Sequence, residues 1–205
     1  MCIFIDIVRR SRAYPFAGKK SKAALPPDSW FDSYHPYSDH YQFWKDLQSA
    51  LPKNIEFISS GTSLEGRDLY GIKLSGSKKV TDKKAIIWHG NVHAREWITH
   101  MTLEYVAYEM VAALKGGKGK KHDPEIKALV DAYDFYIIPF VNPDGFVYSQ
   151  TTNRLWRKNR SPPPPDAANQ TCYGVDVNRN WPYMWTSGEE GSWSPNPCSE
   201  VYHGK

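Results

Sequence analysis

Strand-like and helix-like patterns alternate along most of this chain, and this alternation limits the folds that it can adopt. Apolar, β-branched and aromatic runs predict four strands, at residues 55–60, 69–74, 85–88 and 134–141. Apolar residues at helical spacing, or a proline in the first turn, predict three helices, at residues 39–51, 97–114 and 124–132. Because such alternation is typical of covered parallel sheets, we predict an α/β fold with a mixed, largely parallel central sheet flanked by helices. The last two strands are expected to be buried.

The composition favours a soluble, globular protein without nucleic-acid partners. Of the 205 residues, 40% are hydrophobic and 23% are charged, and the net charge is +4. Lysines cluster at residues 19–22 and 115–121, but without a nucleic-acid motif such clusters are typical of solvated loops. No apolar run is long enough to span a bilayer. We therefore expect no nucleic-acid partner, no membrane association and a monomer.

The first 28 residues differ from the rest of the chain. They are basic, show no sustained periodicity and end near two prolines, so we interpret residues 1–28 as a disordered leader or the remnant of a pro-segment. They contain no convincing secretion signal, because the short apolar run precedes its arginines instead of following them. One globular domain is expected from residue 29 to residue 205, with the prolines at 162–165 in an exposed loop.

Cysteines and glycosylation sequons give a weak indication of the compartment. Cys172 and Cys198 flank a loop-rich stretch, and pairing them would stabilise the fold by about 3.5 kcal/mol in the chain-entropy model. Cys2 has no evident partner. Asn159 and Asn169 each begin an Asn-x-Ser/Thr sequon, although such tripeptides are common by chance. Together these features favour an extracellular protein.

A histidine and a glutamate follow the third predicted strand, at His93 and Glu96. The carboxyl ends of strands are where open α/β sheets place their sites. Imidazole and carboxylate are ordinary zinc ligands, but a catalytic zinc usually takes three protein ligands and a water. A His-x-x-Glu pair by itself is most often structural, so the pair alone does not decide the function.

The residues around this pair are far more specific. The pattern Gly-x-x-His-x-Arg-Glu-Trp-Ile at residues 90–98 resembles the zinc-binding signature of the metallocarboxypeptidases of the carboxypeptidase A/B family, which are secreted enzymes. Four further blocks follow in the order of the family, at residues 141–145, 154–160, 174–181 and 198–204. The resemblance extends from about residue 30 to residue 205.

The resemblance implies a role for each matching residue. His93 and Glu96 would hold one Zn²⁺, which polarises the scissile carbonyl and activates water, and Asp176 would hydrogen-bond the zinc histidine. Arg157 would be catalytic and would also contact the substrate, because it stabilises the developing oxyanion. The remaining matches are substrate contacts and a disulfide: Asn178 and Arg179 for the C-terminal carboxylate, Arg95 near the zinc, and a bond between Cys172 and Cys198. For Arg95 a surface salt bridge remains an alternative, and residues 142–145 are interpreted as a structural turn.

The third zinc ligand and the general-base glutamate of the family lie beyond the position that matches Lys205. The chain therefore resembles the N-terminal two-thirds of a peptidase catalytic domain. His100 lies on one face with His93 if a helix runs through both, and His89 precedes His93 by four residues, but neither matches a ligand of the family. His203 lies in a block that the family does not use for zinc.

The sequence thus predicts a zinc-dependent carboxypeptidase that removes single C-terminal amino acids from peptides or proteins with a free C-terminus. We expect residues 1–205 alone to bind zinc poorly and to be inactive, because they carry two of the three zinc ligands and lack the general-base glutamate. A non-catalytic module that binds C-terminal carboxylates through Asn178 and Arg179, and a fragment without independent function, remain as alternatives.

Overall fold

The computed structural model describes residues 25–76, 82–116, 123–188 and 191–205. A four-stranded mixed sheet forms its centre, in the order β1-β2-β4-β3. The strands are β1 (Ile55–Thr62), β2 (Asp68–Leu74), β3 (Lys84–His89) and β4 (Tyr133–Ile138). All four coincide with predicted strands to within a few residues, because each carries the β-branched and aromatic residues that suit a pleated surface.

The mixed sheet flanked by helices is confirmed, but its pairings among the described strands are not largely parallel. β1 pairs with β2, and β2 with β4, in antiparallel fashion, and only β3 and β4 are parallel. For the first of these pairs the reason is local: β1 and β2 are joined by a short turn with Gly66 at φ 81°, and a short connection can only produce an antiparallel pair.

The expectation that β3 is buried was wrong. β3 has a described partner on one side only, and its residues alternate between exposed and half-buried, with Ile87 60% exposed. β4, between β2 and β3, is the more deeply buried of the two, with Phe135 and Ile137 almost inaccessible. A short apolar run cannot distinguish these two positions, because burial is set by the neighbouring elements.

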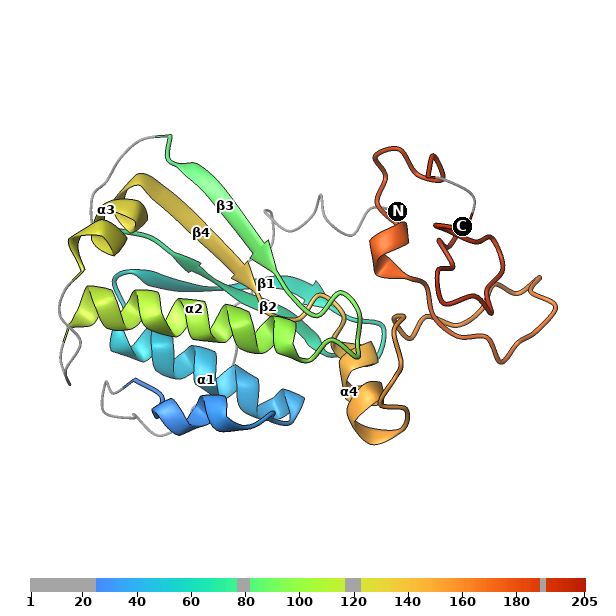
Figure 1. The fold of residues 1–205 in the computed structure, drawn as a ribbon, viewed down its shortest axis with the longest axis horizontal. Coiled ribbons are helices and arrows are strands. Elements are labelled where there is room, and N and C mark those ends of the chain that lie inside the picture. The colour runs from blue at the N-terminus through green and yellow to red at the C-terminus, as the bar shows by residue number, and fades with distance from the viewer. Residues whose placement is uncertain (1–24, 77–81, 117–122, 189–190) are drawn as a thin grey trace.

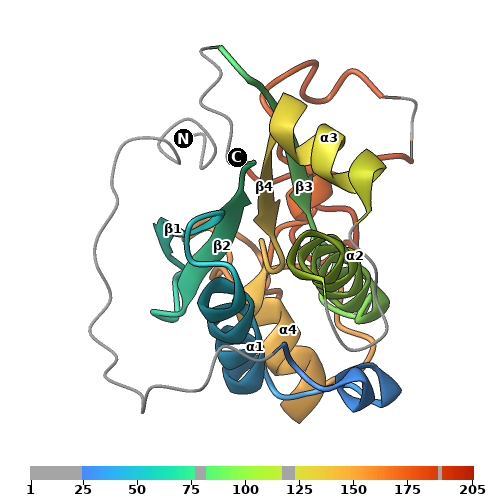
Figure 2. The ribbon, with the colours of Figure 1, turned by 90° about the vertical axis from the view of Figure 1, so that its left-hand side faces the viewer.

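Helices cover one face of this sheet (Figures 1 and 2). They are α1 (Tyr37–Ala50), α2 (Ile98–Lys115) and α3 (Pro124–Ala132), preceded by the 3-10 helix η1 (Asp28–Asp32). α1 and α2 pack side by side against the sheet, and the core between them and the strands contains Trp44, Leu47, Ile72, Val111 and Phe135. The three predicted helices are therefore confirmed.

One α-helix was not predicted. α4 (Pro143–Thr151) begins in the Asn-Pro-Asp-Gly segment that was interpreted as a turn. Pro143 occupies the first helical turn, where its missing N–H costs nothing, and the Asn142 side chain caps the helix by accepting from the Gly145 N–H at 3.0 Å. These residues also favour turns, so the local signal for a helix start was ambiguous.

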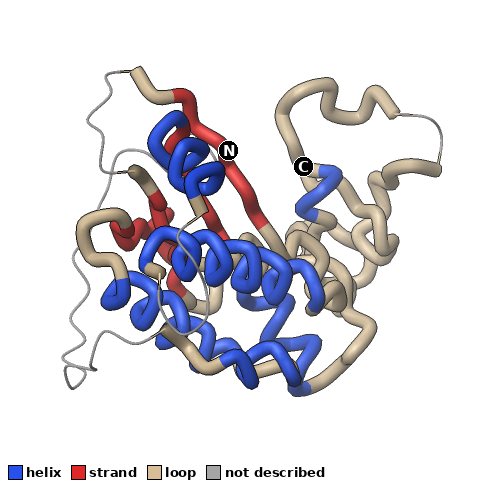
Figure 3. The backbone as a smooth tube through the Cα atoms, turned by 60° about the vertical axis from the view of Figure 1, so that its left-hand side comes forward, coloured by secondary structure: helices blue, strands red, loops and turns tan. Residues whose placement is uncertain are grey.

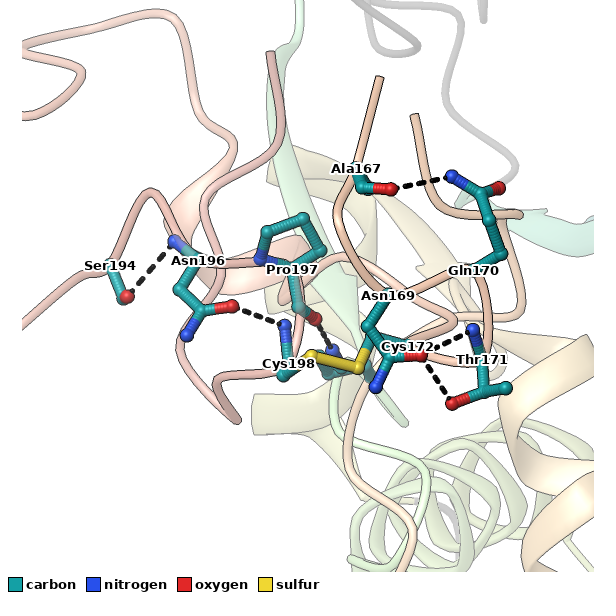
Figure 4. Close-up of a disulfide and its surroundings, with 10 residues drawn as sticks. Ala167, Asn169, Gln170, Thr171, Cys172, Ser194, Asn196, Pro197 and Cys198 are labelled. Carbon is teal, nitrogen blue, oxygen red and sulfur yellow. Dashed lines mark hydrogen bonds between the residues drawn. A yellow bond between two sulfur atoms is a disulfide. The ribbon is translucent and has the colours of Figure 1, made fainter. Parts of the chain in front are cut away.

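The described C-terminal part is mostly irregular chain, as Figure 3 shows by the tan tube, with a single short 3-10 helix, η2 (Val177–Arg179). A disulfide between Cys172 and Cys198 crosslinks this region, as the resemblance implied (Figure 4). Lys158 anchors the region to the rest of the protein, because its buried ammonium donates to the Pro197 carbonyl at 2.6 Å. Burial lowers the pKa of Lys158.

Only the last residues of the predicted leader, 25–28, belong to the described part of the chain. Residues 1–24, including Cys2 and the lysines at 19–22, lie outside the described residues, as do the lysines at 117–121. From residue 25 onward the chain packs on the domain: Leu25 contacts the core, and Asp28 accepts a hydrogen bond from the Tyr108 hydroxyl. In the part of the chain that the structure describes, no helix is long and apolar enough to cross a membrane.

Candidate active site

The His93 segment is a tight turn that joins the end of β3 to the start of α2. Asn91 adopts a left-handed conformation, φ 52°, which asparagine tolerates better than most residues. Its N–H donates to the Thr99 hydroxyl at 2.8 Å, which ties the beginning of the turn to the first turn of α2. The predicted arrangement of strand, turn and helix is confirmed.

Within this turn, the side chains of His93 and Glu96 meet. Nδ1 of His93 lies 2.8 Å from Oε1 of Glu96, and Nε2 of His93 lies 3.2 Å from Oδ1 of Asp176. His93 is 9% exposed and Asp176 is fully buried, whereas Glu96 is exposed. The imidazole of His93 is thus bonded through Nε2 to the buried carboxylate of Asp176, and its Nδ1 lies beside the exposed carboxylate of Glu96.

Arg157 completes this cluster from a different segment. Its Nε and Nη2 donate to the same oxygen of Asp176, Oδ2, at 3.1 and 2.9 Å. Burial alone would raise the pKa of Asp176, but the bonds from His93 and Arg157 outweigh it and lower that pKa. The hydrogen bond to Asp176 in turn raises the pKa of His93 against the opposing effect of burial. Asp176 is therefore a carboxylate that orients two functional groups at once.

Backbone and amide contacts hold these segments in register. The Ala94 N–H donates to the Arg157 carbonyl at 3.0 Å. Asn142, which is buried, donates through Nδ2 to the carbonyls of Val92 and Lys158 at 3.1 and 3.2 Å. The sequence did not predict this role of Asn142. The residue stands in one of the recognised blocks, but the carbonyls that it bonds belong to residues distant in the sequence, which no local pattern reveals.

Asn178 and Arg179 follow Asp176 closely, but their side chains engage other groups. The Asn178 N–H donates to Asp176 Oδ1 at 3.0 Å, which caps η2. The Asn178 side-chain oxygen accepts from Trp181 at 3.2 Å, and the Arg179 guanidinium donates to the Ser192 carbonyl. The structure thus brings these two residues next to the cluster along the chain, without a described side-chain contact to it.

Arg95 lies on the outside of the same turn. It donates to the Leu155 carbonyl at 3.0 Å and forms a salt bridge with Glu200 at 3.2 Å. Both partners are in the blocks that follow in the sequence. The surface salt bridge that was kept as an alternative for Arg95 is therefore present in this structure.

The donor set fits part of a zinc site. Nδ1 of His93 and Oε1 of Glu96 converge, and the tautomer that binds metal through Nδ1 is favoured when Nε2–H donates to a carboxylate, as Asp176 allows. Among the described residues, however, no group of three or more His, Cys, Asp or Glu side chains could hold a metal ion.

The three other histidines considered from the sequence are accordingly not assembled with this pair. His100 is fully buried beside His40 and Phe140, His89 lies near Trp181, and His203 packs against Trp185. None of them joins His93 and Glu96 in a three-ligand group.

The chain is similar to known proteins over most of its length. Residues 40–205 match the family model described as zinc carboxypeptidase. A metallocarboxypeptidase A-like protein of Trichophyton verrucosum is 46% identical over 177 residues, covering 86% of this chain and 38% of that protein. The crystal structure of thrombin activatable fibrinolysis inhibitor superposes with a TM-score of 0.73 at 33% identity, over 87% of this chain and 41% of that one.

A further relative carries a different description. An inactive metallocarboxypeptidase of Ajellomyces capsulatus is 39% identical over 178 residues, covering 85% of this chain and 27% of that protein. The chain spans less than half the length of the curated relatives described here. The match to the family model nevertheless covers most of the chain, from the first turn of α1 to Lys205. The chain therefore belongs to the zinc carboxypeptidase family.

Proposed function

We propose that the protein is a zinc-dependent carboxypeptidase that removes single amino acids from the C-terminus of peptides, with His93 and Glu96 as two of its zinc ligands. The observation that carries the proposal is the convergence of these two side chains at 2.8 Å, with the far nitrogen of His93 bonded to buried Asp176. When bound, zinc acts as a Lewis acid on the scissile carbonyl and lowers the pKa of the attacking water.

Arg157 is the proposed donor to the oxyanion. Its two bonds to Asp176 use Nε and Nη2, and among the described residues no acceptor contacts Nη1. A preorganised donor of this kind stabilises the transition state by about 3 kcal/mol. Its partner Asp176 is fully buried, so the guanidinium is fixed before the substrate arrives.

Asn178 and Arg179 are the proposed grip on the C-terminal carboxylate of the substrate, and Arg95 is a proposed contact near the zinc. A planar guanidinium binds a carboxylate at two points, which suits Arg179 to this task. Arg179 contacts the Ser192 carbonyl and Arg95 contacts Glu200, and both contacts are at exposed positions. Each arginine therefore has to give up exposed hydrogen bonds within the protein for a substrate contact.

Hydrolysis of an N-blocked dipeptide tests the proposal, with the free acid and the C-terminal amide compared under zinc and under a chelator. We expect turnover of the free acid by a chain that also carries a third zinc ligand and a general base, and none by residues 1–205 alone. The turnover should be lost with the chelator and in His93→Ala and Glu96→Ala. His89→Ala is the matched control, because His89 ends β3 four residues earlier and is not part of the cluster. Equal turnover of the amide would contradict a carboxypeptidase.

A second candidate function is binding of C-terminal carboxylates without hydrolysis. The observation that favours it is that only two zinc ligands converge among the described residues, together with the similarity to a relative described as inactive. Calorimetry separates the two functions. Zinc-independent binding of a peptide with a free C-terminus, without turnover and without binding of the amide, would support the binding module over the enzyme.

We also propose that the protein acts outside the cell as a monomer. The disulfide between Cys172 and Cys198 supports this location, because such bonds persist in oxidising compartments. Secretion of the wild-type protein from its source cells, and a single monomeric species in analytical ultracentrifugation, are the expected results. An intracellular pool without the secreted form would contradict the first of these.

A further inference from the structure

Two Asn-x-Ser/Thr sequons lie in the C-terminal part of the chain, and the structure places them in opposite environments. The first begins at Asn159, which is half-buried and contacts Val175, in the irregular chain before η2. Its side-chain oxygen accepts from the Ser161 hydroxyl at 2.8 Å and from the Val175 N–H at 2.8 Å. The Asn159 N–H also donates to the Val175 carbonyl at 3.0 Å. This carboxamide therefore joins two segments of the fold.

The second sequon, at residues 169–171, is exposed along its whole length. Of the residues that the structure describes, only Thr171 donates to the side-chain oxygen of Asn169, through its N–H at 2.9 Å and its hydroxyl at 2.7 Å (Figure 4). Within the described residues, Nδ2 of Asn169 contacts no hydrogen-bond acceptor. Nδ2, the nitrogen to which a glycan would be attached, therefore makes no hydrogen bond in the described part of the fold.

The surroundings of Asn169 keep it at the surface. Gln170 donates to the carbonyls of Pro164 and Ala167 at 3.1 and 2.8 Å, which closes the proline-rich loop upon itself. Cys172, three residues after Asn169, is fixed by its disulfide to Cys198 (Figure 4). The loop is held from both sides, and Asn169 is exposed on it, with its side-chain oxygen bonded back to Thr171. A bulky substituent at this position displaces no packed group.

We propose that Asn169 is a site of N-linked glycosylation and that Asn159 stays unmodified. In this reaction Nδ2 of Asn169 attacks the anomeric carbon of a lipid-diphosphate-linked oligosaccharide, the donor that the secretory pathway supplies. The C–N bond forms, the bond from the anomeric carbon to the diphosphate oxygen breaks, and the amide proton leaves with the lipid diphosphate. No electrons are transferred to or from an external carrier.

Attachment at Asn159 is incompatible with the fold for a physical reason. Its carboxamide lies between two chain segments that are 16 residues apart, in contact with Val175. A sugar on the neighbouring nitrogen would have to enter the same half-buried space. It would separate the segment of Arg157 from that of Asp176, which directly precedes η2.

The inference rests on the proposed passage through the secretory pathway, and it does not depend on peptidase activity. The test is therefore made on the whole protein, secreted from a yeast host behind a cleavable signal. Treatment with peptide-N-glycosidase should reduce the mass of the wild type and convert Asn169 to aspartate in the mapped peptide. Asn169→Gln and Thr171→Ala should lose this mass change completely, and Thr171→Ser should retain it.

The matched control is Ser161→Ala, which destroys the other sequon and leaves the Asn159 carboxamide in place. It should show the same mass change as the wild type. A secreted, disulfide-bonded wild type that carries no releasable glycan would overturn the proposal. So would a glycan that persists in Asn169→Gln, or one that disappears in Ser161→Ala. Because the signal is supplied and hydrolysis is assayed separately, failure here is distinct from failure of the proposed activity.

Discussion

His93 and Asp176 are 83 residues apart in the sequence, and their side chains are hydrogen-bonded, with Nε2 of the imidazole 3.2 Å from Oδ1 of the carboxylate. The same carboxylate receives two hydrogen bonds from Arg157. One buried aspartate therefore sets both the orientation of the proposed zinc ligand and that of the proposed oxyanion donor. We therefore expect zinc binding at the proposed site to depend on Asp176 as well as on the two proposed ligands.

Asp176→Asn tests this dependence. The amide keeps the size of the side chain but loses the negative charge and has one acceptor oxygen where the carboxylate has two. His93 and Arg157, which bond to different oxygens of Asp176, can then no longer both be held as they are now. We expect zinc affinity of the whole protein to fall by about 10- to 100-fold. Competition with a chromophoric chelator measures this without an activity assay. Asp166→Asn is the control, because Asp166 is exposed and its salt-bridge partner is the exposed Lys205. An equal loss in that variant would contradict the assignment.

Asn142→Ala tests how much the hydrogen bonds of Asn142 to the segments of Val92 and Lys158 stabilise the fold. The change removes both donors from the carbonyls of Val92 and Lys158 and the cap of α4. Leaving buried polar groups unpaired costs about 1–3 kcal/mol, and the lost cap adds about 1 kcal/mol. Urea unfolding should show this decrease in the free energy of unfolding. Asn153→Ala, which removes one exposed hydrogen bond from the Leu155 N–H at 3.1 Å, should reduce it by about 1 kcal/mol at most.

The comparison of sequence and structure shows what local patterns can predict. The three helices of the main layer and all four strands follow from apolar spacing, and α3 agrees to the residue because Pro124 and the Asp123 cap mark its start. α4 was missed because its first residues have the composition of a turn. The exposure of β3 was missed because it depends on which strands pair beside it, and this is not encoded in the strand itself.

The candidate site, too, could be predicted from the sequence only in part. His93, Glu96, Asp176 and Arg157 were identified through a resemblance in motif, and the structure brings them together. The present contacts of Arg95 and Arg179 with Glu200 and Ser192 could not be inferred, because irregular segments distant in the sequence supply the partners. The roles proposed for both arginines, and for Asn178, stay predictions until they are measured.

Replacement of both Cys172 and Cys198 by alanine tests how far the disulfide stabilises the irregular C-terminal region. The bond closes a loop of 26 residues, and the chain-entropy model gives a loss of about 3.5 kcal/mol when it is removed. We expect urea unfolding to show this loss, and proteolysis to cleave first within residues 161–205. A stability unchanged from the wild type would mean that the loops are held by their hydrogen bonds and by Lys158 alone.

His100 leads to a prediction about acid stability. It is fully buried next to His40, which is itself bonded to buried Glu104, and within the described residues neither nitrogen of His100 has a hydrogen-bond partner. Burial, reinforced by the charges of His40 and His35, lowers its pKa from 6.5 to about 2. Below pH 6.5 the unfolded chain therefore binds a proton that the folded protein refuses, so this residue reduces stability progressively as the pH falls toward 2.

His100→Leu should remove this acid sensitivity. Between pH 6 and pH 4 the wild type should lose about 2.5 kcal/mol more of its free energy of unfolding than the variant, as linkage requires for one buried neutral histidine. At pH 7 the variant should be about as stable as the wild type, because a buried group without partners is replaced by an apolar one. Urea unfolding at each pH measures both quantities. Burial also lowers the pKa of His89 and of His203, but these residues are common to both proteins and cancel in the difference. Parallel pH profiles for the two proteins would show that His100 accepts a proton in the folded state.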